Sequence, residues 1–358
     1  MDKKRESGLD LLRIFAAFFV CAVHVCNVER EQAVNPEVLD FSYHYFWILF
    51  RLGQTAVACF IALSGAFALR TRSTLDYASF YKKAKKKVVI PTIVFTIFYF
   101  FFESFIKYES GVYADAAGNN VSYVTALLNQ LPGTILGFPA VHMWYMFMLM
   151  ILYLLLPFVA QAKEKMGEHN FAVASVVIWI LGTIDAISSP PNVAWSLGYC
   201  ADILGIVMLG YVFHEWALKK KGNRALGFGM IAAGCAVIAA EYLITLAIRN
   251  NDALLKLLPQ RPHSPFLSVA ALLLIAGFTM MDIKANLGWL SLLTFWVYIV
   301  HPAVMQPVFA VEGAILGIPF AQVGEKDPVL IGTVNMVIVF ILSFVVSHFI
   351  EKWRGRKA

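Results

Sequence analysis

An apolar stretch near the start of the chain, Gly8 to Val25, contains two ionisable residues, Arg13 and His24. Its length and composition predict a membrane-spanning helix. His24 follows Arg13 by eleven positions, and at about 100° per residue this spacing returns to the same helix face. An ionisable group at membrane depth is costly and is a candidate for function. A purely structural explanation is also open, in which Arg13 snorkels to the interface and His24 bonds a neighbouring helix.

The composition of the whole chain is that of a membrane protein. Hydrophobic residues make up 59% of the 358 residues and charged residues only 15%, whereas soluble domains are about 45–50% apolar. The net charge of +6 does not indicate a nucleic-acid partner, because the basic residues lie in short segments between apolar stretches. The five cysteines lie within apolar stretches and form no CxxC or CxxH pair. We therefore expect neither disulfides nor a metal site.

The hydropathy pattern predicts an all-α, polytopic membrane protein of about ten transmembrane helices. We expect one domain over residues 1–358. With the N-terminus in the cytoplasm, 21 of the 29 Lys and Arg residues fall in cytoplasmic segments and six in external ones. This bias predicts that both termini are cytoplasmic. The expected spans are, approximately, 8–27, 46–69, 88–107, 141–161, 170–188, 197–217, 226–248, 265–282, 287–308 and 328–350.

Several other polar residues lie in or beside the expected spans. Glu241 is expected near the outer end of its span, where interfacial water would be enough to solvate it. Ser64 and Gly65 are small and favour close helix packing. His301 precedes Pro302, so its ring can bond a backbone carbonyl that the proline frees. The remaining positions that we single out are Arg51, His142 and Trp144.

The combination of an arginine and a histidine on one helix face suggests a chemistry. Histidine titrates near neutrality and can take a proton from a hydroxyl group. The arginine fork binds phosphate oxygens. Together Arg13 and His24 suit a phosphorylated donor that enters from the cytoplasm and an acceptor that meets it near the histidine. The same residues are also compatible with a proton-coupled transporter.

Four stretches carry recognisable motifs. They are LDLLRIFAAFFVCAVHV at 9–25, CFIALSGAF at 59–67, HMWYMFMLMILYLLLPF at 142–158 and TFWVYIVHP at 294–302. In type and order they resemble the integral-membrane acyltransferase type 3 family, from Leu9 to about Lys352. Within that family the chain looks most similar to bacterial sugar O-acetyltransferases such as those that modify enterobacterial common antigen. The resemblance implies a multi-pass protein of the bacterial inner (cytoplasmic) membrane.

The resemblance also implies a reaction and its residues. Members of the family transfer an acyl group, most often acetyl from cytoplasmic acetyl-CoA, to a hydroxyl of an envelope glycan or lipid-linked saccharide. By position, His24 would be the catalytic histidine, as general base or transient acyl carrier, and Arg13 would hold the donor. No tightly bound cofactor is expected, because acetyl-CoA is a substrate. Residues expected to line the cavity or contact the acceptor are Arg51, Ser64, His142, Trp144 and His301.

One motif departs from the family pattern. The family usually has an Arg-x-x-Arg pair before its third span, and here the aligned residues are Lys83 and Lys86. Lysine still binds phosphate but lacks the bidentate fork. The basic run around these residues also reads as a positive-inside anchor for anionic lipid headgroups. Both residues are retained as candidate donor-binding residues.

Two other function classes fit the same sequence. A transporter or flippase would use the same fold and cavity without binding CoA. A structural subunit of a glycan-assembly complex would tolerate replacement of His24. The sequence names neither the acceptor, nor the acyl group, nor the oligomeric state.

Overall fold

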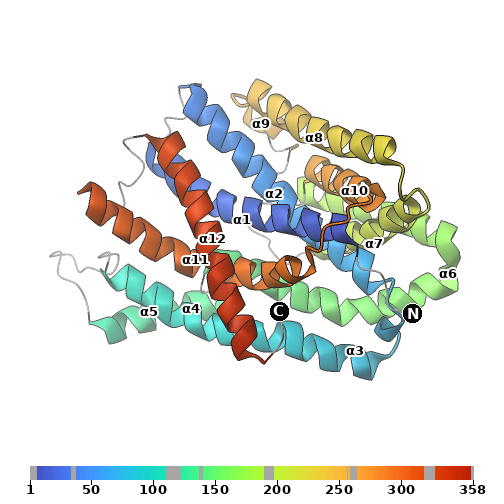
Figure 1. The fold of residues 1–358 in the computed structure, drawn as a ribbon, viewed down its shortest axis with the longest axis horizontal. Coiled ribbons are helices and arrows are strands. Elements are labelled where there is room, and N and C mark those ends of the chain that lie inside the picture. Colours follow the sequence, from blue (N-terminus) through green and yellow to red (C-terminus); the bar gives the residue numbers. More distant parts are fainter. Residues whose placement is uncertain are drawn as a thin grey trace. The chain divides into compact units, whose positions relative to one another are not determined.

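A computed structural model describes most of the chain, and the described part is helical without any strand (Figure 1). This confirms the predicted all-α class. The described residues are 6–33, 38–109, 122–136, 140–188, 197–255, 257–258, 264–317 and 327–355. The helices are α1 (Ser7–Ala33), α2 (Phe41–Ala68), α3 (Tyr77–Ala84), α4 (Ile90–Glu109), α5 (Tyr123–Leu136), α6 (Trp144–Ser188), α7 (Leu197–Leu218), α8 (Arg224–Ala247), α9 (Asp252–Leu255), α10 (Pro265–Met280), α11 (Gly288–Leu316) and α12 (Pro328–Trp353).

Among the described residues, eight helices are long and apolar enough to cross a membrane. The chain is therefore a multi-pass membrane protein. Two features explain the difference from the ten expected spans. The expected spans 141–161 and 170–188 lie in the two parts of the 45-residue α6, which are separated at Gly167, where the backbone leaves the helical conformation (φ 75°, ψ 166°). The expected span 265–282 is α10, an apolar helix of only 16 residues.

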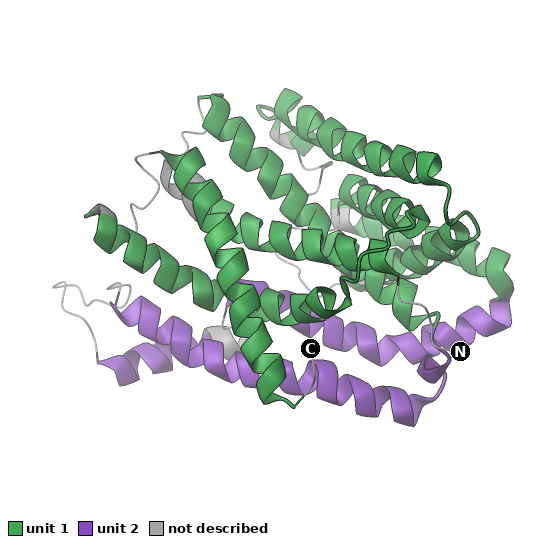
Figure 2. Cartoon of the chain, viewed as in Figure 1, with its two compact units in different colours: residues 1–70, 167–358 green, residues 71–166 purple. Residues whose placement is uncertain are grey.

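The chain forms two compact units, coloured separately in Figure 2. The first unit comprises residues 1–70 and 167–358, and the second comprises residues 71–166. In the first unit, α1 packs against α2, α10, α11 and α12. Helix α2 also packs against α7 and α10, and α8 lies along α10. The helix that carries Arg13 and His24 thus has neighbours from both ends of the sequence.

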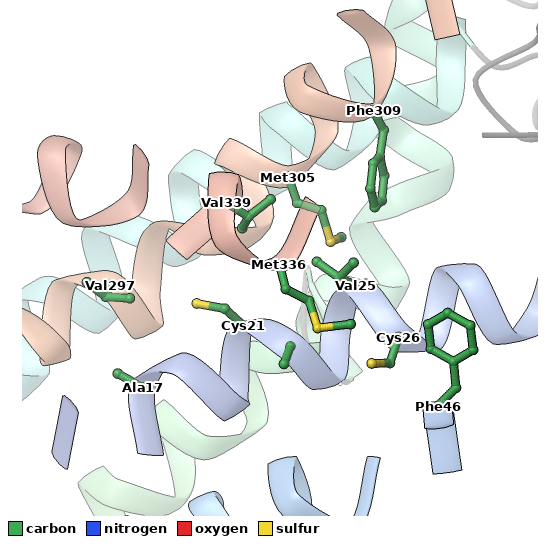
Figure 3. Packing of buried hydrophobic residues seen from close by; sticks show 11 residues of the cluster. Ala17, Cys21, Val25, Cys26, Phe46, Val297, Met305, Phe309, Met336 and Val339 are labelled. Carbon is green, nitrogen blue, oxygen red and sulfur yellow. The ribbon is translucent and has the colours of Figure 1, made fainter. Parts of the chain in front are cut away.

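A cluster of buried apolar side chains fixes α1 against α11 and α12 (Figure 3). Val25, which follows His24, belongs to this cluster. Val297 and Met305 belong to it as well, and they lie one helical turn before and after His301. The same packing therefore fixes the backbone on either side of both histidines. The other members are Ala17, Cys21, Ala22, Cys26, Phe46, Phe309, Met336 and Val339.

The second unit is built from α3, α4, α5 and the first half of α6. A π-helical segment, Lys85–Val89, joins α3 to α4. The Tyr81 hydroxyl donates to the carbonyl oxygen of Leu154 at 2.9 Å and so ties α3 to α6. Helix α5 packs on α4, and the Lys107 ammonium donates to the Gln130 amide oxygen at 2.8 Å. Lys83 and Lys86 lie in this unit, at the start of its long apolar segment.

Helices α2 and α7 approach each other closely at two glycines. A Cβ atom at Gly65 would lie 1.8 Å from the carbonyl oxygen of Val207, and one at Gly210 would lie 2.2 Å from that of Ala62. Neither backbone can give way without moving its helix. Small residues at helix interfaces permit such contact in membranes. The predicted role of Gly65 in close helix packing is therefore confirmed.

Replacing Gly65 by Ala should destabilise the protein, because the added methyl group overlaps the backbone of α7. Overpacking of this kind costs about 1–3 kcal/mol. We expect a clearly lowered thermal unfolding temperature in detergent. Gly229→Ala is the matched control, because a Cβ atom there meets nothing within 4 Å and alanine favours a helix. Equal stability of the two variants would contradict the close-packing interpretation.

Candidate active site

The structure brings together two histidines that the sequence separates by most of its length. The ring centroids of His24 on α1 and His301 on α11 lie 4.9 Å apart, with the ring planes tilted by 46°. His301 is fully buried, whereas His24 is half-buried. Of the two rings, His24 is therefore the one that retains some exposed surface.

A local hydrogen bond sets the protonation pattern of His301. Pro302 has no N–H group, so it leaves the carbonyl of Tyr298, four residues earlier, without its usual helical donor. Nδ1 of His301 lies 2.7 Å from that carbonyl oxygen. A carbonyl oxygen only accepts, so Nδ1 carries the proton and Nε2 of the neutral ring is an acceptor. The expectation that His301 bonds a carbonyl freed by the proline is confirmed.

Arg13 lies against an aromatic ring from the family-like motif on α2. Its guanidinium carbon is 4.3 Å from the centroid of Phe67, within the range of a cation–π contact. Between Arg13 and His24, Ala17 and Val20 are each only 1% exposed. Other parts of the protein thus cover this helix face. A donor arm that ran along this face would require the surrounding helices to separate.

Arg51 forms a buried ion pair. Its Nε atom lies 3.1 Å from a carboxylate oxygen of Glu241, and the two side chains are 0% and 1% exposed. A second nitrogen of Arg51 donates to the Thr245 hydroxyl at 3.4 Å. The expectation that interfacial water solvates Glu241 is therefore wrong, because α2 supplies the compensating charge to α8. Removing one partner of such a pair is strongly destabilising, since it leaves a buried charge without its counter-ion.

The other predicted site residues fall into both units. Ser64 is half-buried on α2, and its hydroxyl donates to the carbonyl oxygen of Phe60 at 2.9 Å. In the second unit, Lys83 and Lys86 are exposed. His142 is buried, with its ring edge-on to Tyr99 at a centroid distance of 4.7 Å. Half-buried Trp144 begins α6. Arg13, His24, Arg51, Ser64 and His301 belong to the first unit.

Sequence reasoning missed a charge cluster at the start of α1. The Glu6 carboxylate accepts from Arg70 at 2.7 Å and lies 2.8 Å from Nε2 of the buried His214. Arg70 also pairs with Glu215 at 3.1 Å. The cluster ties α1, the end of α2 and α7 together. The available signal was the His-Glu pair at 214–215 inside an otherwise apolar span.

The charge cluster controls the ionisation of Glu6. Partial burial by itself would raise the pKa of Glu6. The hydrogen bond from His214 and the positive charges of His214, Arg70 and Lys221 outweigh burial, so the pKa lies below its ordinary value of 4.5. Phe67 links this cluster to Arg13, because its ring centroid is 6.1 Å from that of His214. The ring of Phe67 thus lies close both to Arg13 and to the charge cluster.

The helical spans and the paired histidines define a polytopic membrane protein with a candidate acid–base centre. A comparison with protein families identifies an acyltransferase domain, of the type 3 class, over residues 6–350. The chain therefore belongs to the acyltransferase type 3 family, and it is a membrane acyltransferase. Comparisons with curated proteins and with solved structures gave no match.

Replacing Glu6 by Gln should lower stability in a pH-dependent way. Hydrogen bonds to charged groups contribute about 1.5–3 kcal/mol. Because the pKa of Glu6 is lowered by folding, its stabilisation is complete above the ordinary pKa of 4.5 and is lost as the pH falls through the folded-state value. We expect the difference in unfolding temperature between wild type and Glu6→Gln to be largest near neutrality and to shrink in acid.

The control for this prediction is Glu168→Gln. Glu168 also pairs with a lysine, Lys219, at 3.1 Å, but both side chains are well exposed. Exposed pairs contribute little, so this variant should unfold like the wild type at every pH. A Glu6→Gln difference that does not change with pH would contradict the ionic role of Glu6.

Proposed function

We propose that the protein is an O-acyltransferase of the bacterial inner membrane that moves acetyl from cytoplasmic acetyl-CoA to a hydroxyl of an envelope glycan or glycolipid. Membership of the acyltransferase type 3 family supports the reaction class. The observation that carries the proposal is the half-buried His24 in contact with the buried His301. Acetyl-CoA acts as a substrate, so no tightly bound cofactor is required.

In the proposed reaction His24 acts as a general base. One ring nitrogen takes the proton of the acceptor hydroxyl while the hydroxyl oxygen attacks the thioester carbonyl. The carbon–sulfur bond then breaks and the CoA thiolate leaves. His24 returns its proton to the sulfur, so the products are the acetyl ester and free CoA. In the alternative mechanism His24 is a transient acyl carrier: it first takes the acetyl group from acetyl-CoA and then passes it to the acceptor hydroxyl.

Arg13 is the donor-binding residue of this proposal. Its guanidinium keeps its charge at any working pH and can hold phosphate oxygens while it packs on Phe67. Lys83 and Lys86 add exposed positive charge for the CoA phosphates. Within the first unit, Arg51, Ser64 and His301 are the residues that we assign to the acceptor side.

Replacing His24 by Ala should abolish transfer. Loss of a general base lowers turnover by about 10²–10⁴-fold. The assay follows labelled acetyl from acetyl-CoA into membrane glycolipid or water, with purified protein in detergent. His348→Ala is the control, because His348 is an exposed histidine of α12. Transfer by His24→Ala at the wild-type rate would contradict the catalytic assignment, and folded wild type that neither binds nor turns over CoA would favour a transporter.

Replacing Arg13 by Ala should mainly weaken use of the donor. A charge-assisted hydrogen bond contributes about 1.5–3 kcal/mol, so the KM for acetyl-CoA should rise by about 10–100-fold. Arg224→Ala serves as the control, because Arg224 is an exposed arginine at the start of α8. If Arg13→Ala changed only the apparent affinity for the acceptor, Arg13 would belong to the acceptor site instead.

A further inference from the structure

A cavity of about 250 Å³ lies at the start of α1, and none of the residues assigned so far to the proposed reaction lines it. Its walls come from the first residues of α1, from the turn between α7 and α8, and from the end of α10 with the segment that follows. All three places belong to the first unit. The Lys and Arg bias of the sequence predicts that all three face the cytoplasm. This α1 cavity therefore lies on the side from which a cytoplasmic donor arrives.

Two lysines and a helix terminus favour an anion in the α1 cavity. Lys221 and Lys284 line it, and within the described part of the chain neither ammonium group forms an ion pair. Ser7 and Gly8, at the start of α1, line it as well. The N–H groups of a first helical turn have no acceptor within the helix, and they attract phosphate oxygens.

Two carboxylates also line the α1 cavity, and they restrict which anion fits. The charge of Glu6 is balanced, because one oxygen accepts from Arg70 at 2.7 Å and the other lies 2.8 Å from Nε2 of His214. Asp282 is exposed and can accept hydrogen bonds from a ligand. A bare phosphate dianion offers Asp282 no donor. A nucleotide offers ribose hydroxyls and an amino group as well as phosphates, so it matches both kinds of wall.

The other walls and the volume suit one nucleotide. Phe278, Met281 and Ile283 supply apolar surface on which a flat base can pack. Thr279 also lines the cavity; it is 2% exposed, and its hydroxyl has no hydrogen-bond partner among the residues that the structure describes. A buried hydroxyl without a partner is costly, and a polar ligand atom would compensate it. Pockets that enclose a drug-sized ligand measure about 300–1,000 Å³, so this smaller cavity can hold only part of CoA.

We propose that the α1 cavity binds the 3′-phosphoadenosine end of the acyl-CoA donor, with Lys221 and Lys284 beside its 3′-phosphate. This inference rests on the proposed acyl-transfer function. It adds two donor-binding residues to Arg13, from the α7–α8 turn and from the segment between α10 and α11.

The order of the sites along α1 matches the order of the groups in CoA. Glu6 precedes Arg13 by seven positions, and Arg13 precedes His24 by eleven, so all three lie on one helix face. The rise along the helix is about 10 Å for the first interval and about 16 Å for the second. The nucleotide at the α1 cavity, the diphosphate at Arg13 and the thioester at His24 follow one another along that face.

Removing the charge of Lys284 should weaken only a donor that carries the 3′-phosphate. We expect the KM of Lys284→Gln for acetyl-CoA to rise about tenfold, because a charge-assisted hydrogen bond is lost, while kcat stays unchanged. The KM for acetyl-dephospho-CoA, which lacks this phosphate, should stay within about twofold of wild type. Lys221→Gln should behave alike, but Lys221 also acts on the charge of Glu6, so Lys284 gives the cleaner test.

Lys219→Gln is the matched control. Lys219 is an exposed lysine two positions before Lys221, it pairs with Glu168 at 3.1 Å, and it is not part of the cavity wall. Its replacement should leave the KM for both donors unchanged.

A binding measurement tests the α1 cavity without any transfer. Adenosine 3′,5′-bisphosphate is the nucleotide end of CoA, and a ligand that binds the folded state raises the unfolding temperature. We expect it to stabilise the wild type and Lys219→Gln in detergent, but not the double variant Lys221→Gln/Lys284→Gln. Equal stabilisation by inorganic pyrophosphate would overturn the inference, because the cavity would then bind any such anion.

The kinetic results have equally definite readings. An equal rise of KM with both donors would overturn the inference, since Lys284 would then not bind the 3′-phosphate. A loss of donor discrimination in Lys83→Gln instead of Lys284→Gln would also overturn it, because the nucleotide would belong to the second unit. If wild type transfers acetyl and the Lys221 and Lys284 variants equal it, only this inference fails. If folded wild type neither binds nor turns over acetyl-CoA, the proposed function fails with it.

Discussion

Polar groups inside a membrane must find their partners within the protein, and the packing of the first unit follows from this constraint. Arg51 and Glu241 satisfy each other across α2 and α8. The carbonyl that Pro302 frees accepts a hydrogen bond from Nδ1 of His301. The Arg51–Glu241 pair fixes how α2 and α8 meet, because a shift of either helix would leave a buried charge without its partner. The positions of the reactive side chains are therefore tied to the stability of the fold.

Small residues and a dense apolar cluster supply the remaining order. Gly65 and Gly210 allow α2 and α7 to touch through their backbones. The cluster around Val25 and Val297 holds α1 against α11 and α12. As lipid tails are as apolar as the side chains, this packing must come from close fit rather than from hydrophobic burial alone. This packing places His24 and His301 next to each other, although their helices are far apart in sequence.

The start of α1 is held by charge as well as by close fit, since a Cβ atom at Gly8 would lie 2.0 Å from the carbonyl oxygen of Phe278. Glu6 joins Arg70 and His214, and Phe67 lies between His214 and Arg13. Arg13, the candidate donor-binding residue, therefore contacts the ring of Phe67. That ring in turn lies near His214, which pairs with Glu6. The two ends of the Arg13–His24 face therefore differ, with an ionic cluster near Arg13 and a contact between two imidazole rings at His24.

The sequence by itself determined the features that depend on one helix or on neighbouring residues. Hydropathy gave most of the spans, the eleven-residue spacing put Arg13 and His24 on one helix face, and the His301–Pro302 neighbours specified the carbonyl contact. The two expected spans 141–161 and 170–188 correspond to the two parts of α6 on either side of Gly167, where the backbone leaves the helical conformation. Only the tertiary structure decided that Glu241 pairs with Arg51, that Glu6 reaches His214, and that His24 meets His301. Each of these contacts joins separate helices, and periodicity along one helix carries no information about which residue of another helix will face it.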